Sequence, residues 1–321
     1  MKQLFTLQPG ALKLAQLREW WQAPQQLSLH AEAHEAIQRS FQTVHDVLAA
    51  GKVVYGINTG FGLLANTRIP PEKLNDLQRR IVLSHAAGTQ ELMPDTVVRL
   101  MLLLKIRTLS RGYSGVRPEV IQALLELLNH EVYPCVPSKG SVGASGDLAP
   151  LAHLVLPLLG EGTVRIQGAI YPAVEGLAKV GLKPIGTLAP KEGLALLNGT
   201  QASTALALHG LFQIERVFHA ALVTGAMAVE AAMGSRAPFD ARIHAVRGQP
   251  GQIAVAESFR QLLGEQSEIG VAHENCEKVQ DPYSLRCQPQ VMGAVVDQMQ
   301  HASAILVREA NGVTDNPLVF S

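Results

Sequence analysis

The chain has 321 residues, 47% of them hydrophobic, and its 27 basic and 27 acidic side chains give a formal net charge of zero. This length and hydrophobic content are enough for one or two large buried cores. The balanced charge argues against nucleic acid or an acidic membrane surface as a partner, because such partners usually require a basic excess.

The sequence shows no clear secretory signal, membrane span or paired-cysteine motif. The amino terminus lacks the apolar stretch of a secretory signal. The longest apolar run, residues 148–159, is interrupted by His153 and is shorter than the ~18 residues of a membrane span. Only three cysteines occur, without CxxC spacing, which indicates reduced thiols and neither a disulfide framework nor a zinc site. We therefore expect a soluble, cytoplasmic protein without a bound metal.

Helical periodicity dominates the first half of the chain. From Ser28 to Gly51 the apolar residues recur at spacings of three and four, so we predict a helix that Ser28 caps and Gly51 ends. Further helices are expected from Leu74, over residues 97–109 and from Pro118. The helix over 97–109 is apolar nearly all round, which predicts that it is buried inside a bundle.

The second half of the chain predicts longer helices. Residues 200–233 contain no proline, and a helix of roughly 34 residues would be about 50 Å long. A second long helix is expected from Pro289 to about Asn311, whereas residues 162–171 read as a small β-hairpin. We predict a mainly α protein in two parts: an irregular, glycine-rich domain over residues 1–198 and a long-helix bundle over 199–321.

A glycine- and serine-rich segment, residues 138–147, separates two apolar helices. Its composition alone favours an ordinary loop. It lacks the GxxxxGK[ST] pattern of a phosphate-binding loop. It is not a nucleophile elbow either, because Gly146 follows Ser145 directly and GxSxG needs a residue between them.

The tripeptide Ala144-Ser145-Gly146 offers another chemistry. In a tightly bent backbone, the amide nitrogen of Gly146 can attack the carbonyl carbon of Ala144, and glycine tolerates that geometry. Loss of water and of the Ser145 hydroxyl then leaves an exocyclic methylene on a five-membered ring, 4-methylideneimidazole-5-one (MIO). We expect Asp147 to be the N-cap of the next helix, whose positive end would stabilise negative charge near the ring.

Residues 140–152, GSVGASGDLAPLA, closely resemble the signature of the aromatic amino-acid ammonia-lyases. The tripeptide alone is nearly meaningless, but the longer segment is highly specific, and other segments along most of the chain match as well. The resemblance implies the long-helix bundle of the fumarase/aspartase-like superfamily. It also implies an MIO group formed autocatalytically from residues 144–146, without an external cofactor, and a homotetramer with shared active sites.

Residues 55–62, YGINTGFG, look like the lid loop of that family. The spacing of Gly60, Gly62 and Ala65 imitates a dinucleotide fingerprint, but residues 66–71 break the helix that such a motif must open. By resemblance, Tyr55 is the leading candidate for the base that removes the β-proton of the substrate. An unperturbed tyrosine has a pKa near ~10, so this role requires a nearby positive charge or dipole that lowers the pKa of Tyr55. The alternative is a packing tyrosine.

A second specific segment is residues 280–287, QDPYSLRC. The resemblance implies that Arg286 grips the α-carboxylate of the substrate, as the guanidinium fork suits. Gln280 and Tyr283 lie six and three residues before it, so we expect all three on one helical face. Tyr283 is the second candidate for the base.

Two asparagines match further family positions. Asn198, in LLNGT, corresponds to a family asparagine near the MIO carbonyl, although Asn-Gly is also a common turn pair. Asn316, in TDNP, matches another position near the substrate. Both are expected to orient the substrate or the ring.

The choice of substrate depends mainly on residues 83–88, LSHAAG. This stretch resembles the histidine-specific enzymes of the family, whose histidine there contacts the substrate imidazole, so His85 is the specificity candidate. The alternative is a core or capping histidine. Residues 288–293, QPQVMG, point the same way. The implied reaction is elimination of ammonia from L-histidine to give trans-urocanate, and the rivals are phenylalanine or tyrosine ammonia-lyases and aminomutases.

The family's chains continue well past the point where this chain stops. By resemblance, the further part supplies an acidic and an aromatic residue near the substrate, and helices that pack the bundle. A truncated, inactive structural module of such an enzyme is therefore a third interpretation of the sequence.

Overall fold

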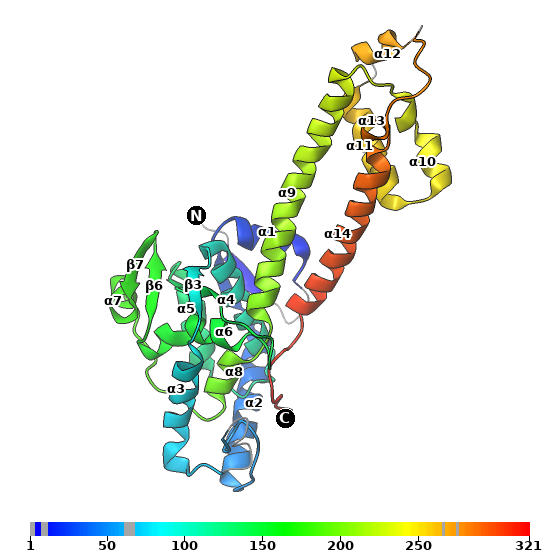
Figure 1. Cartoon of the computed structure of the whole chain (residues 1–321). Helices are drawn as coiled ribbons and strands as arrows, with labels where there is room; N and C mark the ends of the chain where they lie inside the picture. The colour runs from blue at the N-terminus through cyan, green and yellow to red at the C-terminus, as the bar shows by residue number, and fades with distance from the viewer. Residues whose placement is uncertain (1–3, 8–11, 61–67, 265–266, 274–275) are drawn as a thin grey trace. The chain divides into compact units, whose positions relative to one another are not determined.

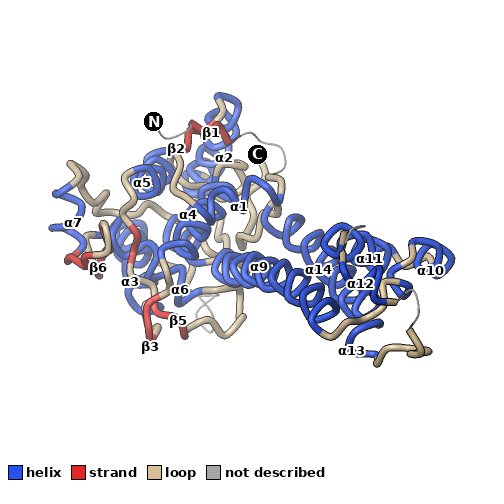
Figure 2. The backbone as a smooth tube through the Cα atoms, turned by 90° about the horizontal axis from the view of Figure 1, so that it is seen from above, coloured by secondary structure: helices blue, strands red, loops and turns tan. Residues whose placement is uncertain are grey.

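The computed structural model describes residues 4–7, 12–60, 68–264, 267–273 and 276–321, and most of them lie in helices (Figures 1 and 2). This confirms the predicted mainly α class. The chain forms two compact units, one of residues up to 209 together with 307–321 and one of residues 210–306. The domain boundary predicted between residues 198 and 199 marks the start of the long helix and stays a prediction.

The first unit is built around a helix that is buried on every side. Residues 97–109 of α4 (Asp95–Leu109) are all buried, as predicted, and α4 packs against α1, α5 and α6. The other described helices that lie wholly within this unit are α1 (Leu14–Gln22), α2 (Ala31–Ala49), η2 (Pro71–Lys73), α3 (Leu74–His85), α5 (Pro118–Asn129), α6 (Leu148–Val155), η3 (Leu156–Leu159), α7 (Ala173–Lys179) and α8 (Glu192–Leu197).

Short strands tie distant loops of the first unit together. The predicted hairpin is confirmed as β6 (Thr163–Ile166) and β7 (Ala169–Pro172), and β4 (Tyr133–Pro134) joins it as a third, antiparallel strand. A separate pair joins β3 (Thr89–Leu92) to β5 (Pro137–Lys139), with Thr89 opposite Lys139. This pair holds the end of α3 beside the start of the glycine- and serine-rich segment.

The start of α2 differs from the prediction. Ser28 lies in β2 (Gln26–Leu29), which pairs in parallel with β1 (Leu4–Leu7), so it does not cap the helix. His30 is the N-cap instead, and its ring accepts a hydrogen bond from the Glu32 backbone N–H. The far end agrees with the prediction, because Gly51 adopts a left-handed conformation (φ 66°) just after the helix.

The two long helices contribute residues to both units. The helix α9 (Gln201–Ala231) has 31 residues, close to the expected length, and α14 (Gln288–Ala310) begins one residue before the predicted start. In the part of the chain that the structure describes, no helix is both long and apolar enough to cross a membrane.

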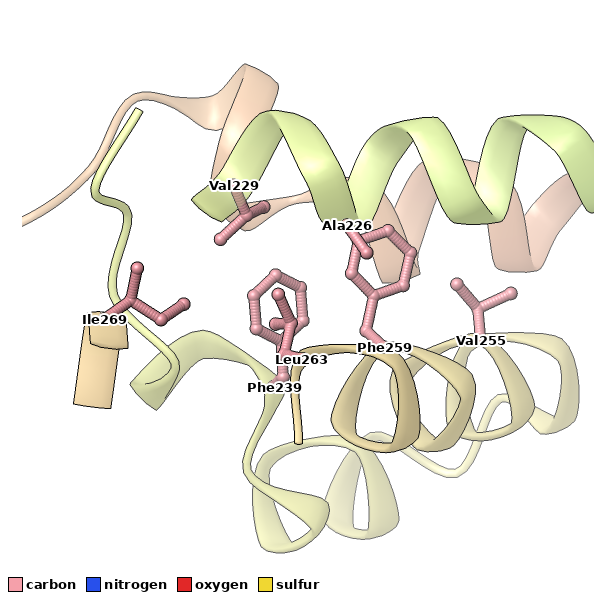
Figure 3. Close-up of a cluster of buried hydrophobic side chains, with 7 residues drawn as sticks. All are labelled: Ala226, Val229, Phe239, Val255, Phe259, Leu263 and Ile269. Atoms are coloured by element: carbon pink, nitrogen blue, oxygen red, sulfur yellow. The ribbon is translucent and has the colours of Figure 1, made fainter. Parts of the chain in front are cut away.

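The second unit has its own hydrophobic core. Figure 3 shows side chains from α9, η4 (Ala237–Phe239), α11 (Pro250–Leu263) and α12 (Glu268–Ala272) facing one another. At its centre the rings of Phe239 and Phe259 stack, with centroids 5.0 Å apart. The same unit contains α10 (Ala241–Arg247) and the short α13 (Tyr283–Arg286). Buried members of this core are Ala226, Val229, Phe239, Val255, Phe259, Leu263 and Ile269.

Candidate functional site

The Ala144-Ser145-Gly146 tripeptide forms a sharp, exposed turn just before α6. Ser145 and Gly146 both have positive φ angles, 63° and 97°, and so does Gly143 at 69°. A serine in the left-handed region is uncommon and costs roughly 1–2 kcal/mol. The backbone is therefore strongly bent at the position where ring closure between Gly146 and Ala144 requires a bend.

Gly146 presses against Gly199, which lies at the start of α9. The two glycines form an isolated parallel bridge, and the Asp147 N–H donates to the Gly199 carbonyl over 2.8 Å. A Cβ added to Gly146 would overlap that carbonyl oxygen and would lie 2.8 Å from the Gly199 nitrogen. Only glycine fits here, so the amide nitrogen of residue 146 stays unhindered by a side chain.

Asp147 occupies the N-cap position of α6, as predicted, but its carboxylate does not cap that helix. It accepts hydrogen bonds from the backbone N–H of Ser203 (2.7 Å) and from the hydroxyls of Ser203 (2.5 Å) and Ser141 (2.7 Å). The first N–H groups of a helix have no partner within the helix, and the Asp147 carboxylate binds one of them in the first turn of α9. Asp147 thus links the turn to the helix that follows Gly199.

Asn198 lies between α8 and α9, directly before Gly199. Its side-chain amide nitrogen donates to the backbone carbonyl of Asn316, so the two predicted asparagines are neighbours. Its Oδ1 atom is buried and has no hydrogen-bond partner among the residues that the structure describes. Burial of an unpaired polar atom costs about 1–3 kcal/mol, so this oxygen is suited to accept a hydrogen bond from a bound donor.

A lysine that the sequence analysis overlooked lies beneath this junction. Lys105 of α4 is fully buried, and its Nζ donates to the carbonyls of Ala195 (3.2 Å) and Asn198 (2.6 Å). Burial is the main cause that lowers the pKa of Lys105 to about 7. Its signal in the sequence is a lysine inside a mainly apolar helix that also carries Arg99 and Arg107.

A second buried cation supports the Asn316 segment. Lys191 and Asp315 form an ion pair of 2.8 Å in which both side chains are inaccessible to solvent. Asp315 also accepts a hydrogen bond from the backbone N–H of Asn316 (2.7 Å). The pair fixes the residue before Asn316, whose carbonyl then receives the Asn198 side chain.

His85 is the last residue of α3, directly before a short loop. Its Nδ1 is 2.7 Å from the carbonyl oxygen of Ile81, so Nδ1 carries the proton in the neutral ring and Nε2 is an acceptor. His85 thus makes the contact with the end of α3 that a capping histidine would make, and its Nε2 can accept a hydrogen bond from another group.

The loop that follows His85 is held by α6. The Gly88 N–H donates to Nε2 of His153 over 3.0 Å, and a Cβ on Gly140 would lie 3.1 Å from the Gly88 Cα. Burial lowers the pKa of His153, which favours the neutral ring that this hydrogen bond requires. The His85 loop and the segment leading to Ala144 are therefore adjacent.

Tyr55 lies on the loop after α2 and is partly exposed. Gly56, with φ 76°, approaches both α8 and the Asn316 segment, because an added Cβ would lie 2.8 Å from side-chain carbons of Leu194 and Pro317. The buried Asn58 closes this loop through its side-chain contacts with Lys52 and Val54. Phe61, Gly62 and the rest of the rejected dinucleotide pattern up to residue 67 lie outside the described residues.

The QDPYSLRC segment lies in the second unit. Gln280 and Arg286 line a cavity of about 300 Å³ together with Asp281, Ser235 and Gln290. The Arg286 Nε donates to the Asp281 carbonyl over 3.0 Å.

Tyr283 does not line that cavity and is 71% exposed. Its ring stacks under the Arg286 guanidinium, whose carbon is 4.3 Å from the ring centroid. The expectation of one helical face for Gln280, Tyr283 and Arg286 is wrong. The helix α13 begins only at Tyr283, because Pro282 disfavours helical geometry at the residue before it.

The predicted site residues thus fall into two sets, each described by itself. Those of the first unit are Tyr55, His85, Ala144, Ser145, Gly146, Asn198 and Asn316, and those of the second are Gln280, Tyr283 and Arg286. Among the described residues, no cluster of three or more histidine, cysteine or acidic side chains could hold a metal ion.

The sequence of the chain is similar to those of known proteins. The sequence model of the family described as aromatic amino acid lyase matches residues 12–321. A histidine ammonia-lyase from Idiomarina loihiensis is 73% identical over 317 residues, which are 99% of this chain and 62% of that protein. One from Vibrio cholerae is 63% identical, over 98% of this chain and 61% of that protein. The chain therefore spans about 61–62% of the length of these curated relatives.

Solved structures with the same fold include enzymes that are named for several different substrates. Histidine ammonia-lyase from Trypanosoma cruzi has a TM-score of 0.87 and 34% identity, over 99% of this chain and 59% of that one. Ergothionase from Treponema denticola has a TM-score of 0.93 and 28% identity, over 99% and 63%. Phenylalanine aminomutase from Pantoea agglomerans has a TM-score of 0.88 and 30% identity, over 99% and 64%.

Proposed function

The chain belongs to the aromatic amino acid lyase family, and we propose from that membership that it carries the catalytic loop of a histidine ammonia-lyase. The reaction is elimination of ammonia from L-histidine to give trans-urocanate. The observation that carries the proposal is the bent Ala144–Gly146 turn clamped against Asn198–Gly199, with the His85 loop adjacent. Relatives named for histidine, 61–73% identical, favour that substrate over phenylalanine or tyrosine.

The residues around the turn fit an MIO ring made from Ala144, Ser145 and Gly146. Gly146 has no side chain to hinder its nitrogen, and Ser145 is already in a strained, left-handed conformation. Asn198 directly precedes Gly199, whose backbone contacts Gly146, and its buried Oδ1 is an acceptor without a described partner, which suits an N–H donor of the substrate. When formed, the ring supplies an electrophilic methylene that takes up the substrate amino group and makes nitrogen a better leaving group.

The substrate would be held by groups with complementary chemistry. The His85 Nε2, left as an acceptor by the Nδ1 contact with Ile81, suits the N–H of a substrate imidazole. The Arg286 guanidinium suits the α-carboxylate, and Gln280 borders the same cavity. We assign removal of the β-proton to Tyr55, on the glycine-hinged loop, with Tyr283 as the second candidate.

We also propose a cytoplasmic homotetramer whose active sites combine residues from several subunits. Its support is the exposure of large apolar side chains on the long helices, including Val217, Met227 and Val291 at 62–69%. Such side chains are typical of surfaces that another protein chain covers.

Turnover of two chains tests the function. Urocanate formation is followed by ultraviolet absorbance for the 321-residue chain and for a version extended with the C-terminal portion of the Idiomarina loihiensis relative. We expect urocanate from L-histidine, and neither cinnamate from phenylalanine nor coumarate from tyrosine. Cinnamate or coumarate as the main product would favour the rival lyases, whereas an active extended chain beside an inactive native one would favour the inactive-module interpretation for these 321 residues.

A further inference from the structure

The first unit buries a cation that the proposed reaction does not use. Lys105 has no exposed surface, and it belongs to the stretch of α4, residues 97–109, in which every residue is buried. Desolvation of an ammonium group is unfavourable, so an apolar side chain of the same length would be easier to bury. A lysine at this position needs a reason beyond filling space.

The reason lies in the two carbonyls that Lys105 contacts. The carbonyls of Ala195 and Asn198 belong to the C-terminal end of α8, where backbone acceptors lack partners within the helix. An ammonium group at this end also lies favourably in the field of the helix dipole. Lys105 therefore ties the end of α8 to the central helix α4.

That end of α8 continues directly into the clamp of the catalytic loop. The Asn198 carbonyl is held by Lys105 at 2.6 Å, and the next carbonyl, of Gly199, accepts from the Asp147 N–H at 2.8 Å. Two consecutive carbonyls thus join the buried helix to the turn that contains Gly146. The side chain of Asn198 is oriented by the same peptide.

Charges from three neighbouring segments act on Lys105. The carboxylates of Asp315 and Asp147 favour its charged form, and Lys191 opposes it. Asp147 and Asp315 each hold a part of the same site, through Ser203 and through Asn316. Lys105 is thus surrounded by the groups that support the turn.

We propose that Lys105 is a positioning residue of the catalytic loop, which holds the Asn198–Gly199 peptide where it clamps Gly146 and directs the Asn198 amide. The catalytic character of the loop rests on the proposed function, whereas the positioning itself rests on the contacts of Lys105.

Hydrogen–deuterium exchange tests the positioning in a Lys105→Met variant, which keeps the apolar stem and removes the donors. We expect amides in peptides covering 140–150 and 194–204 to exchange at least about tenfold faster, while the β6–β7 hairpin is unchanged. The matched control is Arg99→Met. Arg99 is a buried cation of the same helix, and it donates to the carbonyls of Trp20 and Trp21 at the end of α1.

A general structural role for buried cations of α4 predicts equal effects of the two variants on the turn. Faster exchange at 140–150 in both, or in neither, would overturn the proposal. If Lys105→Met does not fold, Lys105→Gln, which keeps a shorter donor, is compared with Arg99→Met by the same peptides.

Ring formation provides the second readout, since closure and dehydration remove two water molecules from residues 144–146. We expect the Lys105→Met chain to contain at least about tenfold less of the dehydrated peptide by mass spectrometry than the Arg99→Met chain. If the native chain lacks the dehydrated peptide, the proposed function fails at this point, and the exchange experiment still decides the role of Lys105.

Discussion

Ser145 carries the hydroxyl that the proposed ring formation needs, but its backbone adopts a conformation that serine disfavours. Its φ of 63° is a conformation that glycine adopts at no steric cost, and the flanking Gly143 and Gly146 do so. In the proposed ring formation, serine is needed here because its hydroxyl is the group that leaves to create the methylene. The strain at Ser145 is consistent with a backbone shaped for ring closure and not for stability.

Two substitutions at Ser145 separate the role of the hydroxyl from the cost of the backbone strain. In Ser145→Ala no hydroxyl can leave, so we expect no dehydrated peptide and no urocanate, with an unfolding free energy within about 0.5 kcal/mol of native. Ser145→Gly should be equally inactive and more stable by up to about 1 kcal/mol, because glycine removes the strain. Peptide mass and urea unfolding measure both. Ser258→Ala, at an exposed serine of α11, is the control, and a dehydrated peptide in Ser145→Ala would contradict the mechanism.

The second prediction at this scale concerns His85. Leucine at this position keeps the bulk of the side chain but removes the Nε2 acceptor, which we expect to cost about 1–2 kcal/mol of substrate binding. The kcat/KM for L-histidine should fall by roughly tenfold or more, mainly through KM. The measurement uses whichever of the two chains turns over. An unchanged KM would show that His85 only caps α3.

At the scale of elements, close backbone contacts decide how helices of the second unit pack. Gly293 of α14 faces the beginning of α11, where an added Cβ would overlap the backbone of Gln252 and lie 2.8 Å from the carbonyl carbon of Gly251. Backbone atoms at both sides cannot rotate away as a flexible side chain does. Glycine is therefore required on structural grounds at this crossing.

Alanine substitutions at two helical glycines test this contact. Gly293→Ala should lower the unfolding free energy by roughly 2 kcal/mol or more, because the overlap outweighs the helix-propensity gain of about 1 kcal/mol. Gly210→Ala, in α9, should raise it by up to about that amount, since no described atom lies within 4 Å of its added Cβ. Urea unfolding of both variants gives the two signs. Equal shifts would refute the packing argument.

Local sequence signals predicted the elements well where the cause was local. The helix after Pro118, the buried α4 and the hairpin at 163–172 follow from proline, apolar periodicity and turn residues. The start of α2 was missed because the pairing of Ser28 with Thr6 is a long-range contact.

The site shows the same limit. Its turn could be located from residues 140–152, but the partners that fix it lie far along the chain. Asp147 bonds to Ser203, and Lys105 bonds to Asn198, in contacts between residues that no spacing rule connects. The sequence places three basic residues, Arg99, Lys105 and Arg107, in this helix, and it does not single out Lys105 or name its partner.

At the scale of the whole molecule, the predicted residues are divided between two units with separate cores. The turn, His85 and Asn198 belong to the first, and Arg286 belongs to the second. The proposed homotetramer adds residues of other subunits to the proposed active sites. Sedimentation analysis of the 321-residue chain should therefore give an oligomer, and a monomer at micromolar concentration would contradict this part of the proposal.

The lowered pKa of Lys105 also makes the stability of the chain depend on pH. Its pKa is about 7 in the folded chain and near 10.5 when unfolded, because burial disfavours the charged form. Between these values the unfolded chain binds more protons, so the contribution of Lys105 to the unfolding free energy rises with pH; below about pH 7 both states are protonated and the contribution is constant. From pH 7.5 to 9.5 the rise should be about 2 kcal/mol.

Other groups titrate over the same range, so the measurement is a comparison between two chains. Urea unfolding of the native chain and of Lys105→Met at pH 7.5 and 9.5 gives two pH dependences, and their difference isolates the lysine. We expect the native chain to gain about 2 kcal/mol relative to the variant as the pH rises. The carboxylates of Asp315 and Asp147, which favour the charged form of Lys105, remain in both chains. Parallel pH dependences would mean that Lys105 keeps its charge in the fold, and that the carbonyls of Ala195 and Asn198 with the two carboxylates compensate its burial fully.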